Sequence, residues 1–276
     1  MESCSIQKLK APESQDAFSR TAKLSIPNRP SDALSGSQIL DQIRDLPREE
    51  REVIIWNEVK KGNIPNFLRT LVMVSDTVEI QNQKVNIRYY VLPDYLALGS
   101  NMDYFLCPMT PLVGQKIASE LGCFLPTRKM VNQIWKVAVL QLEPEPIPPS
   151  AKMVTVPVFE KHNNLVWKQR RTFLNSKPLG SLVSGHKKDV IISNGISKNR
   201  NQGKVVIYGW HYTTGEPIQP LYAGHADYYA DYSHGIRLIQ QIVYVNEEPM
   251  LASDLLRSEK LHVLLSDEGP IKKAYY

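Results

Sequence analysis

The sequence predicts an α+β protein, in which a helical N-terminal half packs on a mixed or antiparallel sheet from the C-terminal half. Three observations lead to this class. Helical apolar spacing with clear capping residues prevails before residue 143, and strand-like runs with turn residues prevail after residue 150. The proline-rich segment EPEPIPPS, residues 143–150, separates the two halves. No internal repeat or heptad pattern is present.

The expected helices follow from apolar spacing and from residues that begin or end a helix. They are 35–46 after Ser35 or Ser37, 48–62 ending at Gly62, 111–122 after Thr110, a helix starting after Thr127, and one from His162 to Phe173. Short helical turns are expected at 251–269.

The expected strands are apolar or alternating runs bounded by turn residues. Residues 84–93 and 236–245 each predict a strand, and residues 70–74 lead into a sheet. Residues 187–193 and 204–212 predict a hairpin with a long polar tip, since Asn194, Gly195 and Gly203 are turn formers.

The domain organisation follows from length and composition. Residues 1–34 are polar, contain three prolines and show no periodicity, so we expect a flexible N-terminal arm. We expect residues 35–276 to form a single α+β domain, because this length suits one large domain. The 143–150 segment is either a sub-boundary within it or a long surface loop.

Charge and hydropathy limit the partners. The formal net charge is +5, without a dense basic stripe interleaved with aromatic residues, so nucleic acid is not an expected partner. No apolar run approaches the roughly 18 residues that span a bilayer. The N-terminus lacks the apolar core of a signal peptide, yet 19 prolines and 13 tyrosines favour an extracytoplasmic protein, periplasmic or secreted. We therefore expect such a location with the signal absent from this chain, and a cytoplasmic location and any oligomeric state stay open.

The three cysteines show no metal-binding or redox spacing. Cys4, Cys107 and Cys123 contain no C-x-x-C pair. We interpret Cys107 and Cys123 as packing residues, and leave open whether they form a disulfide.

The segment from Tyr208 to Leu238 concentrates groups that transfer protons. We predict four catalytic residues in it: His211, His225, Asp231 and His234. An imidazole beside a carboxylate makes a proton-transfer pair, because the carboxylate orients the ring and stabilises its charged form. The predicted substrate-binding residues are Arg237, Lys187, Tyr232 and Trp210.

A metal site is the alternative chemistry for the same histidines. Two or three imidazoles with one carboxylate and an open position resemble catalytic zinc. The chain has no H-E-x-x-H motif and no other pair of histidines three to five residues apart. We therefore predict no cofactor, with zinc as an alternative and the metal ligands unknown.

The motif SHGIRL, residues 233–238, resembles the L,D-transpeptidase signature, in which Ser-His-Gly precedes a nucleophilic cysteine and an arginine. IYGWH, residues 207–211, resembles an earlier strand of that family. Ile236 stands where the cysteine should be, so the resemblance does not imply acyl-enzyme chemistry. More broadly, LPTRKMVNQIW, GHKKDV, IYGWH, IQPL and YADYSHGIRL resemble an uncharacterised, mostly exported bacterial protein family without known mechanism.

These observations predict a hydrolase of a polar envelope substrate, such as a cell-wall peptide or glycan, that uses a His/Asp site. One alternative is a non-catalytic envelope binding protein with a tyrosine-rich recognition surface. A further alternative is a zinc-dependent hydrolase. The expected partner is a polar small molecule or polymer.

Overall fold

The computed structural model describes residues 21–197 and 203–276, and it confirms the α+β class. The helices of this part of the chain are α1 (Gly36–Ile43), α2 (Arg48–Lys60), α3 (Pro111–Glu120), α4 (Arg128–Val137), α5 (Val156–Thr172) and α6 (Ala252–Arg257). Short 3-10 turns are η1 (Asn66–Arg69), η2 (Ala151–Val154), η3 (Asn194–Ser197) and η4 (His262–Leu264).

The strands form one larger sheet, a second smaller sheet and two short pairs. They are β1 (Thr21–Lys23), β2 (Thr70–Ile80), β3 (Gln83–Val91), β4 (Ala97–Gly99), β5 (Tyr104–Leu106), β6 (Cys123–Phe124), β7 (Leu140–Gln141), β8 (Val183–Ser184), β9 (Lys188–Val190), β10 (Ile207–His211), β11 (Pro217–Tyr222), β12 (His234–Gly235), β13 (Ile239–Gln240), β14 (Ile242–Val245) and β15 (Glu248–Leu251).

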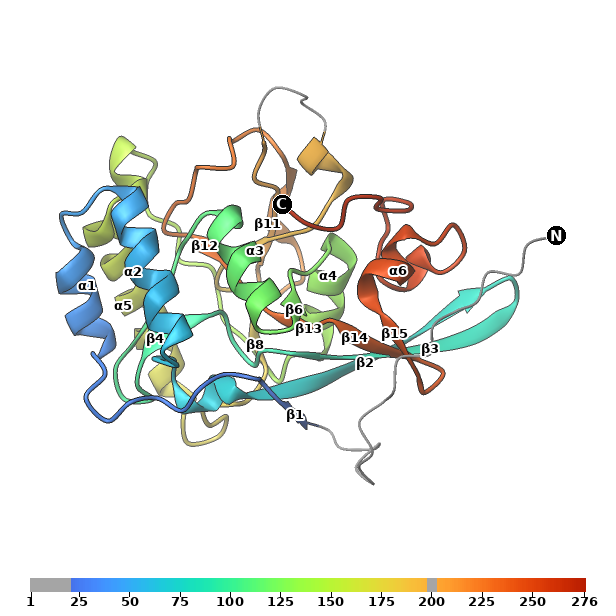
Figure 1. The fold of residues 1–276 in the computed structure, drawn as a ribbon, viewed down its shortest axis with the longest axis horizontal. Helices are drawn as coiled ribbons and strands as arrows, with labels where there is room; N and C mark the ends of the chain where they lie inside the picture. The colour runs from blue at the N-terminus through green and yellow to red at the C-terminus, as the bar shows by residue number, and fades with distance from the viewer. Residues whose placement is uncertain (1–20, 198–202) are drawn as a thin grey trace.

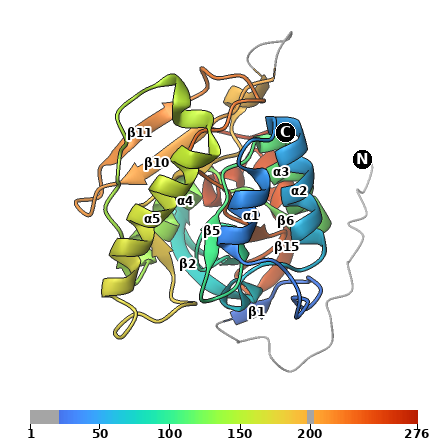
Figure 2. The same ribbon diagram turned by 90° about the vertical axis from the view of Figure 1, so that its left-hand side faces the viewer.

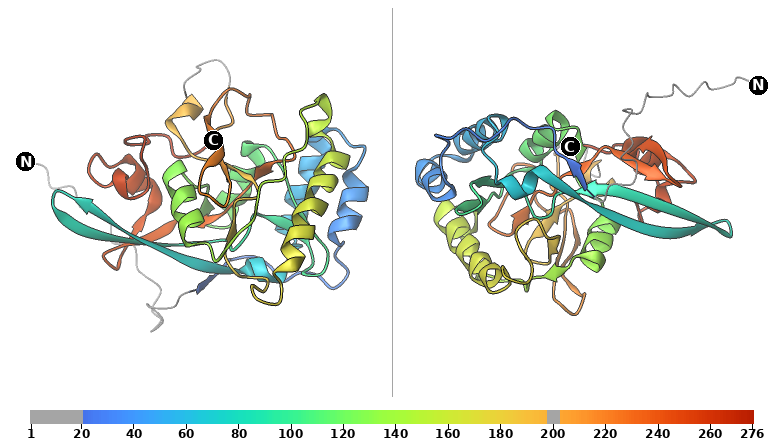
Figure 3. Two further views of the ribbon diagram at one scale, coloured as in Figure 1. Left: turned by 180° about the vertical axis from the view of Figure 1, so that it is seen from behind. Right: turned by 90° about the horizontal axis from the view of Figure 1, so that it is seen from below.

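The larger sheet draws strands from both halves of the chain. Its order is β1-β2-β3-β13-β6, and β14 pairs with both β3 and β15. The β2–β3 hairpin projects well beyond the rest of the molecule (Figures 1 and 3). Its tip residues, Gln81 and Asn82, have positive φ values, which suit the tight turn between long antiparallel strands.

The helices α1, α2 and α5 gather at the end of the molecule opposite the projecting hairpin (Figure 1). Viewed from that end, α5 lies on one flank and α2 and α3 on the other (Figure 2). The predicted caps hold α1 and α4: Ser35 forms a capping box with Gln38, and the Thr127 hydroxyl accepts from the Met130 N–H. Ile39 and Ile43 place the buried face of α1 in the core.

The smaller sheet, β11-β10-β9-β12, carries the segment that the sequence singles out. The strands β9 and β10 pair antiparallel, which confirms the predicted hairpin, while β12 runs parallel to β9. The tip residues 198–202 of this hairpin lie outside the described residues. Gly209 and Trp210 both have positive φ, so β10 departs from regular alternation where it approaches the site.

Several local features differ from the sequence expectations. Helix α5 begins at Val156 rather than at His162, because Thr155 precedes it and Pro157 suits its first turn. The predicted strand at 236–245 divides at Gln241 into β13 and β14.

Part of the predicted arm and the proline-rich connector pack against the body. In the arm, β1 pairs with β2, and Arg29 donates to Asn63 Oδ1 and to the carbonyl of Gly99. The remainder of the arm, residues 1–20, lies outside the described residues. In the connector, the Ile147 N–H donates to the Tyr232 hydroxyl.

The cysteines Cys107 and Cys123 are free and buried in the hydrophobic core, which confirms the packing interpretation. Burial raises the pKa of both thiols, so they remain protonated at neutral pH.

Candidate functional site

The segment from β11 to β12 brings three of the four predicted catalytic residues together around one carboxylate. Asp231 Oδ1 accepts from the Ser233 hydroxyl at 2.5 Å and from the Ser233 N–H at 2.8 Å. Asp231 Oδ2 accepts from the Tyr229 hydroxyl at 3.3 Å and lies 3.9 Å from His234 Nε2. This carboxylate is therefore the centre of a group that we call the open cluster: Lys188, His225, Tyr229, Asp231, Ser233 and His234.

His234 is almost fully buried, yet neither ring nitrogen has a hydrogen-bond partner among the described residues. Burial lowers its pKa to about 4, so the imidazole is neutral at pH 7. Burial would raise the pKa of Asp231, but His234, Lys188 and Ser233 hold it below the ordinary value. The pair is thus a charged carboxylate beside a neutral imidazole that is able to accept a proton.

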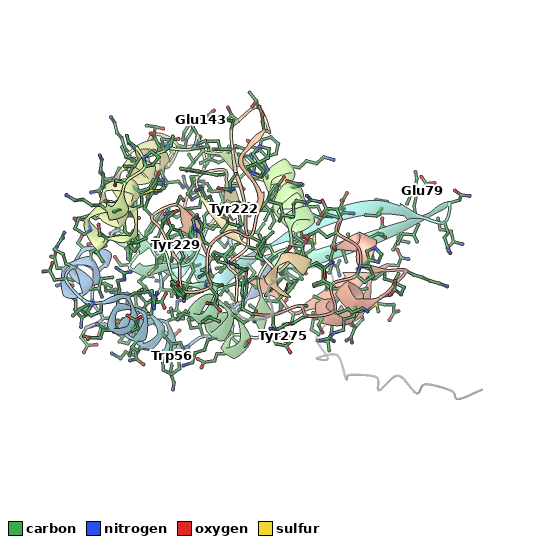
Figure 4. The ribbon with its side chains drawn as sticks, turned by 90° about the horizontal axis from the view of Figure 1, so that it is seen from above. Trp56, Glu79, Glu143, Tyr222, Tyr229 and Tyr275 are labelled. Atoms are coloured by element: carbon green, nitrogen blue, oxygen red, sulfur yellow. The ribbon has the colours of Figure 1, made fainter. Side chains whose placement is uncertain are left out.

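The outer wall of the open cluster is formed by His225 and Tyr229. Their rings stack with centroids 4.0 Å apart, and Tyr229 also meets His234 edge to face at 5.7 Å. Both side chains are partly exposed, so this wall is where the cluster meets solvent. Figure 4 shows Tyr229 and Tyr222 on the same face of the molecule.

Lys188 adds a cation to this side of the sheet. It faces His234 in the β9–β12 register, and its ammonium lies 5.1 Å from the centre of the Trp210 ring. No described carboxylate lies within 4.0 Å of it to form an ion pair. Burial lowers the pKa of Lys188, while the charge of Asp231 opposes that shift.

Predicted residue Arg237 belongs to a different group. We call this group the closed network: Asp94, Tyr95, His186, Asp189 and Arg237. Arg237 Nε lies 3.7 Å from Asp189 Oδ1, its Nη atoms donate to the carbonyls of Leu92 and Val183, and its guanidinium lies over the Tyr95 ring. The Tyr95 hydroxyl donates to Asp189 Oδ2 at 2.7 Å. Every one of these polar groups is buried, so Arg237 is engaged in the interior rather than presented to a substrate.

The rest of the closed network is the pair of Asp94 and His186, whose Oδ1 and Nε2 lie 3.0 Å apart. Burial would raise the pKa of Asp94, but His186 and Arg237 hold it below the ordinary value. The neighbouring Lys187 is also buried, and its ammonium donates to the Tyr232 carbonyl at 2.6 Å. Burial lowers the pKa of Lys187 to about 7.

The remaining predicted residues lie apart from the Asp231 carboxylate. His211 Nε2 contacts Asn132 Oδ1 at 3.1 Å, its ring stacks on Trp135, and burial lowers its pKa to about 4. The Tyr232 hydroxyl bonds the backbone of Ile147. Trp210 is buried, and its ring faces His162 and Tyr232 at centroid distances of 6.3 and 6.2 Å.

Among residues 21–197 and 203–276, no group of three or more His, Cys, Asp or Glu side chains is arranged to hold a metal ion. In the same part of the chain, no helix combines the length and apolar character needed to cross a membrane.

The sequence analysis omitted Lys188 and Tyr229 from the site. Strand alternation could have indicated Lys188, because it places this residue on the opposite face of the strand from Lys187 and Asp189. In the structure, His234 is its partner in the β9–β12 register. Tyr229 stands two residues before Asp231, and its hydroxyl reaches that carboxylate only because the chain turns at 226–229.

Comparison with protein-family models, with curated proteins and with solved structures found no match for this chain. The resemblances drawn from short motifs therefore stay predictions, and the functional argument depends on the geometry alone.

Proposed function

We propose that this chain is a hydrolase that acts on a polar substrate at the open cluster. The observation that carries the proposal is His234, a buried imidazole without a hydrogen-bond partner in the described chain, 3.9 Å from a charged carboxylate. Buried polar groups are almost always satisfied, so an exception needs an explanation. His162 is another buried imidazole without a partner in the described chain, and the carboxylate at 3.9 Å distinguishes His234 from it.

His234, Asp231 and Lys188 carry the chemistry in this scheme. His234 is the general base that takes a proton from the attacking water, and Asp231 orients it and stabilises the imidazolium that forms. The protonated His234 then returns this proton to the leaving group, while His225, whose pKa is lowered by burial, contributes its ring to the outer wall. The Lys188 ammonium stabilises the negative charge that develops in the transition state, since no described carboxylate neutralises it within ion-pair distance.

The proposed substrate is a cell-wall peptide or glycan. Tyrosine and histidine rings on the outer wall offer stacking and hydrogen-bonding surfaces of the kind that polar polymers need. The proline- and tyrosine-rich composition supports an extracytoplasmic location as part of the same proposal.

The second candidate is a non-catalytic binding protein of the envelope. It is favoured by the exposure of tyrosines on and beside the same segment: Tyr212 and Tyr222 are each 43% exposed and Tyr228 is 53% exposed. Exposed aromatic rings are frequent anchors at recognition surfaces.

The test is a turnover assay on muropeptides, glycan chains and ester substrates. We expect His234→Asn and Asp231→Asn to lower kcat/KM by roughly a hundredfold or more, the usual contribution of general acid–base catalysis. The matched control is His211→Asn, which removes an equally buried histidine outside the open cluster and should keep nearly full activity.

Two outcomes would count against the hydrolase. Equal turnover by the wild type and His234→Asn would remove the imidazole from the chemistry. Binding of peptidoglycan without turnover, abolished by Tyr222→Ala and unaffected by His234→Asn, would favour the binding protein. Elemental analysis of the purified protein tests the zinc alternative, which requires stoichiometric metal that is lost in His225→Ala.

A further inference from the structure

A groove of about 470 Å³ lies beside the open cluster and shares Tyr229 with it. Its walls come from α2, from η2 and from residues 228–230. Two arginines, Arg48 and Arg51, face apolar and aromatic side chains across it, among them Met153, Val154 and Tyr228. A cationic group within an apolar groove is a combination that specific ligand sites share.

Arg51 is the unusual member of this groove. Its side chain is only 8% exposed, and its guanidinium lies over the Phe159 ring at 5.2 Å. Its one hydrogen bond in the described chain is a long one, from Nη1 to the Val154 carbonyl at 3.3 Å. No described carboxylate lies within 4.0 Å to form an ion pair with it. A buried cation without a counter-ion is unfavourable, and it is normally paired with an acid.

The neighbouring acids act on Arg51 only from beyond ion-pair distance, where the charges of Glu52 and Glu49 raise its pKa in part against the effect of burial. Both Glu52 oxygens accept from Thr110, from its N–H and from its hydroxyl. Glu49 pairs with Arg48. The Cys107 thiol is protonated because burial raises its pKa. Among the described residues, Arg51 is thus the cation of the groove that has no ion pair.

The second arginine of the groove, Arg48, contacts the aromatic wall. Arg48 donates to the Tyr228 carbonyl at 2.7 Å and lies over the Tyr228 ring at 5.3 Å. It therefore holds the aromatic wall of the groove in place, and its own charge is already paired with Glu49.

We propose that this groove binds the carboxylate of a monoanionic ligand with an apolar body, and that Arg51 is the residue that pairs with the carboxylate. A single guanidinium without an ion pair matches a single negative charge, and its planar fork matches the two oxygens of a carboxylate. A phosphate monoester carries nearly two charges and would require a second free cation. The apolar body packs against Met153, Val154 and the tyrosine rings.

The proposal concerns binding alone, so it holds whether or not the open cluster is catalytic. Carboxylates of this kind occur both on simple aliphatic acids and at the C-terminus of a peptide. Three probes separate these sources: octanoate, acetyl-Ala-Leu with a free carboxylate, and acetyl-Ala-Leu with its C-terminal amide.

The experiment is titration calorimetry of the full chain with each probe. We expect at least one of the two acids to bind and the amide to bind at least about tenfold more weakly, because the amide cannot form a charge-assisted pair. Arg51→Met should weaken binding of the acid by a similar factor, and Arg51→Lys, which keeps the charge, should restore part of the loss. The peptide acid binding more tightly than octanoate identifies a peptide terminus, and the reverse order identifies an aliphatic acid.

Arg44→Gln is the matched control. Arg44 is the C-cap residue of α1 and is paired with Asp41 and Glu160, so its substitution removes one positive charge without touching the groove. Thermal unfolding of each variant verifies that it is folded. Equal binding of acid and amide, an unchanged affinity in folded Arg51→Met, tighter binding of phenyl phosphate than of both acids, or no binding of either acid would each overturn the proposal.

Discussion

The closed network and the open cluster lie beside the same two short strands, β9 and β12, and both contain buried carboxylates next to cations or imidazoles. In the closed network each carboxylate has a basic side chain close by: Asp94 meets His186 at 3.0 Å, and Asp189 meets Arg237 at 3.7 Å. In the open cluster, Lys188 has no ion pair and His234 no hydrogen bond among the described residues. The two groups share residue types and burial and differ in how their charges are paired, and we base the proposal of a functional role for the open cluster on that difference.

The largest expected difference between the two groups is in stability. Arg237→Met leaves the Asp189 carboxylate buried without its cation, and breaking a buried pair in this way costs about 3–5 kcal/mol. Lys188→Met removes a partly exposed cation without a close partner, and we expect a change below about 1 kcal/mol. Chemical denaturation measures both free energies of unfolding.

Equal losses of stability in these two variants would erase the distinction between the groups. The double variant Arg237→Met with Asp189→Asn sharpens the test, because it removes both charges. It should recover part of the stability that the single variant loses.

The next expected effect is that His234 and Asp189 make the free energy of unfolding depend on pH in opposite directions. The pKa of His234 falls from the ordinary 6.5 to about 4 in the folded chain, so the unfolded chain binds its proton first as the pH falls. Stability is therefore lost as the pH falls from about 6.5 to 4, by an amount on the order of 3 kcal/mol. His234→Asn should lose less stability across this window, as thermal unfolding at a series of pH values will show.

Asp189 in the closed network should show the opposite slope. Burial raises its pKa from 3.8 to about 6, so its contribution to stability is complete below pH 3.8 and is lost as the pH rises through 6. Asp189→Asn should therefore lose less stability than the wild type as the pH rises through this range. The difference in stability between wild type and variant should change with pH in opposite directions for His234→Asn and Asp189→Asn. A change in the same direction would contradict the assigned environments.

The smallest expected effect is the difference in stability loss between two tyrosine variants, one in each group. Tyr95→Phe removes a 2.7 Å hydrogen bond to the buried Asp189 carboxylate, which should cost about 1–3 kcal/mol. Tyr229→Phe removes a 3.3 Å bond to Asp231 from a partly exposed ring, and should cost less than about 1 kcal/mol. Denaturant midpoints of the two variants suffice for the measurement, and a larger loss for Tyr229→Phe would reverse the comparison.

The fold class was predictable because helix capping and strand alternation are local. Ser35 and Thr127 cap their helices as expected, and the β9–β10 hairpin forms across the predicted turn. The start of α5 was not predictable from apolar spacing, because its first turn depends on Thr155 and Pro157 rather than on periodicity.

The candidate site was predictable only where its members are close in sequence. His225, Asp231 and His234 lie within ten residues, and the structure brings them together. The partners of Arg237 come from far away, since Asp189 is 48 positions earlier and Tyr95 lies earlier still. The positive φ of Gly209 and Trp210 interrupts the alternation of β10, so the direction of His211 could not be read from its position in the strand.

The projecting β2–β3 hairpin has a practical consequence. Its tip at Gln81 and Asn82 is a tight turn at the far end of a long arm (Figure 1). Tyr229, which the open cluster and the groove share, lies in the body of the molecule, away from Glu79 on that arm (Figure 4). Exposed turns of this kind tolerate insertions well. A tag or fluorophore placed between these two residues would hold the protein on a surface with both proposed sites left free for ligand.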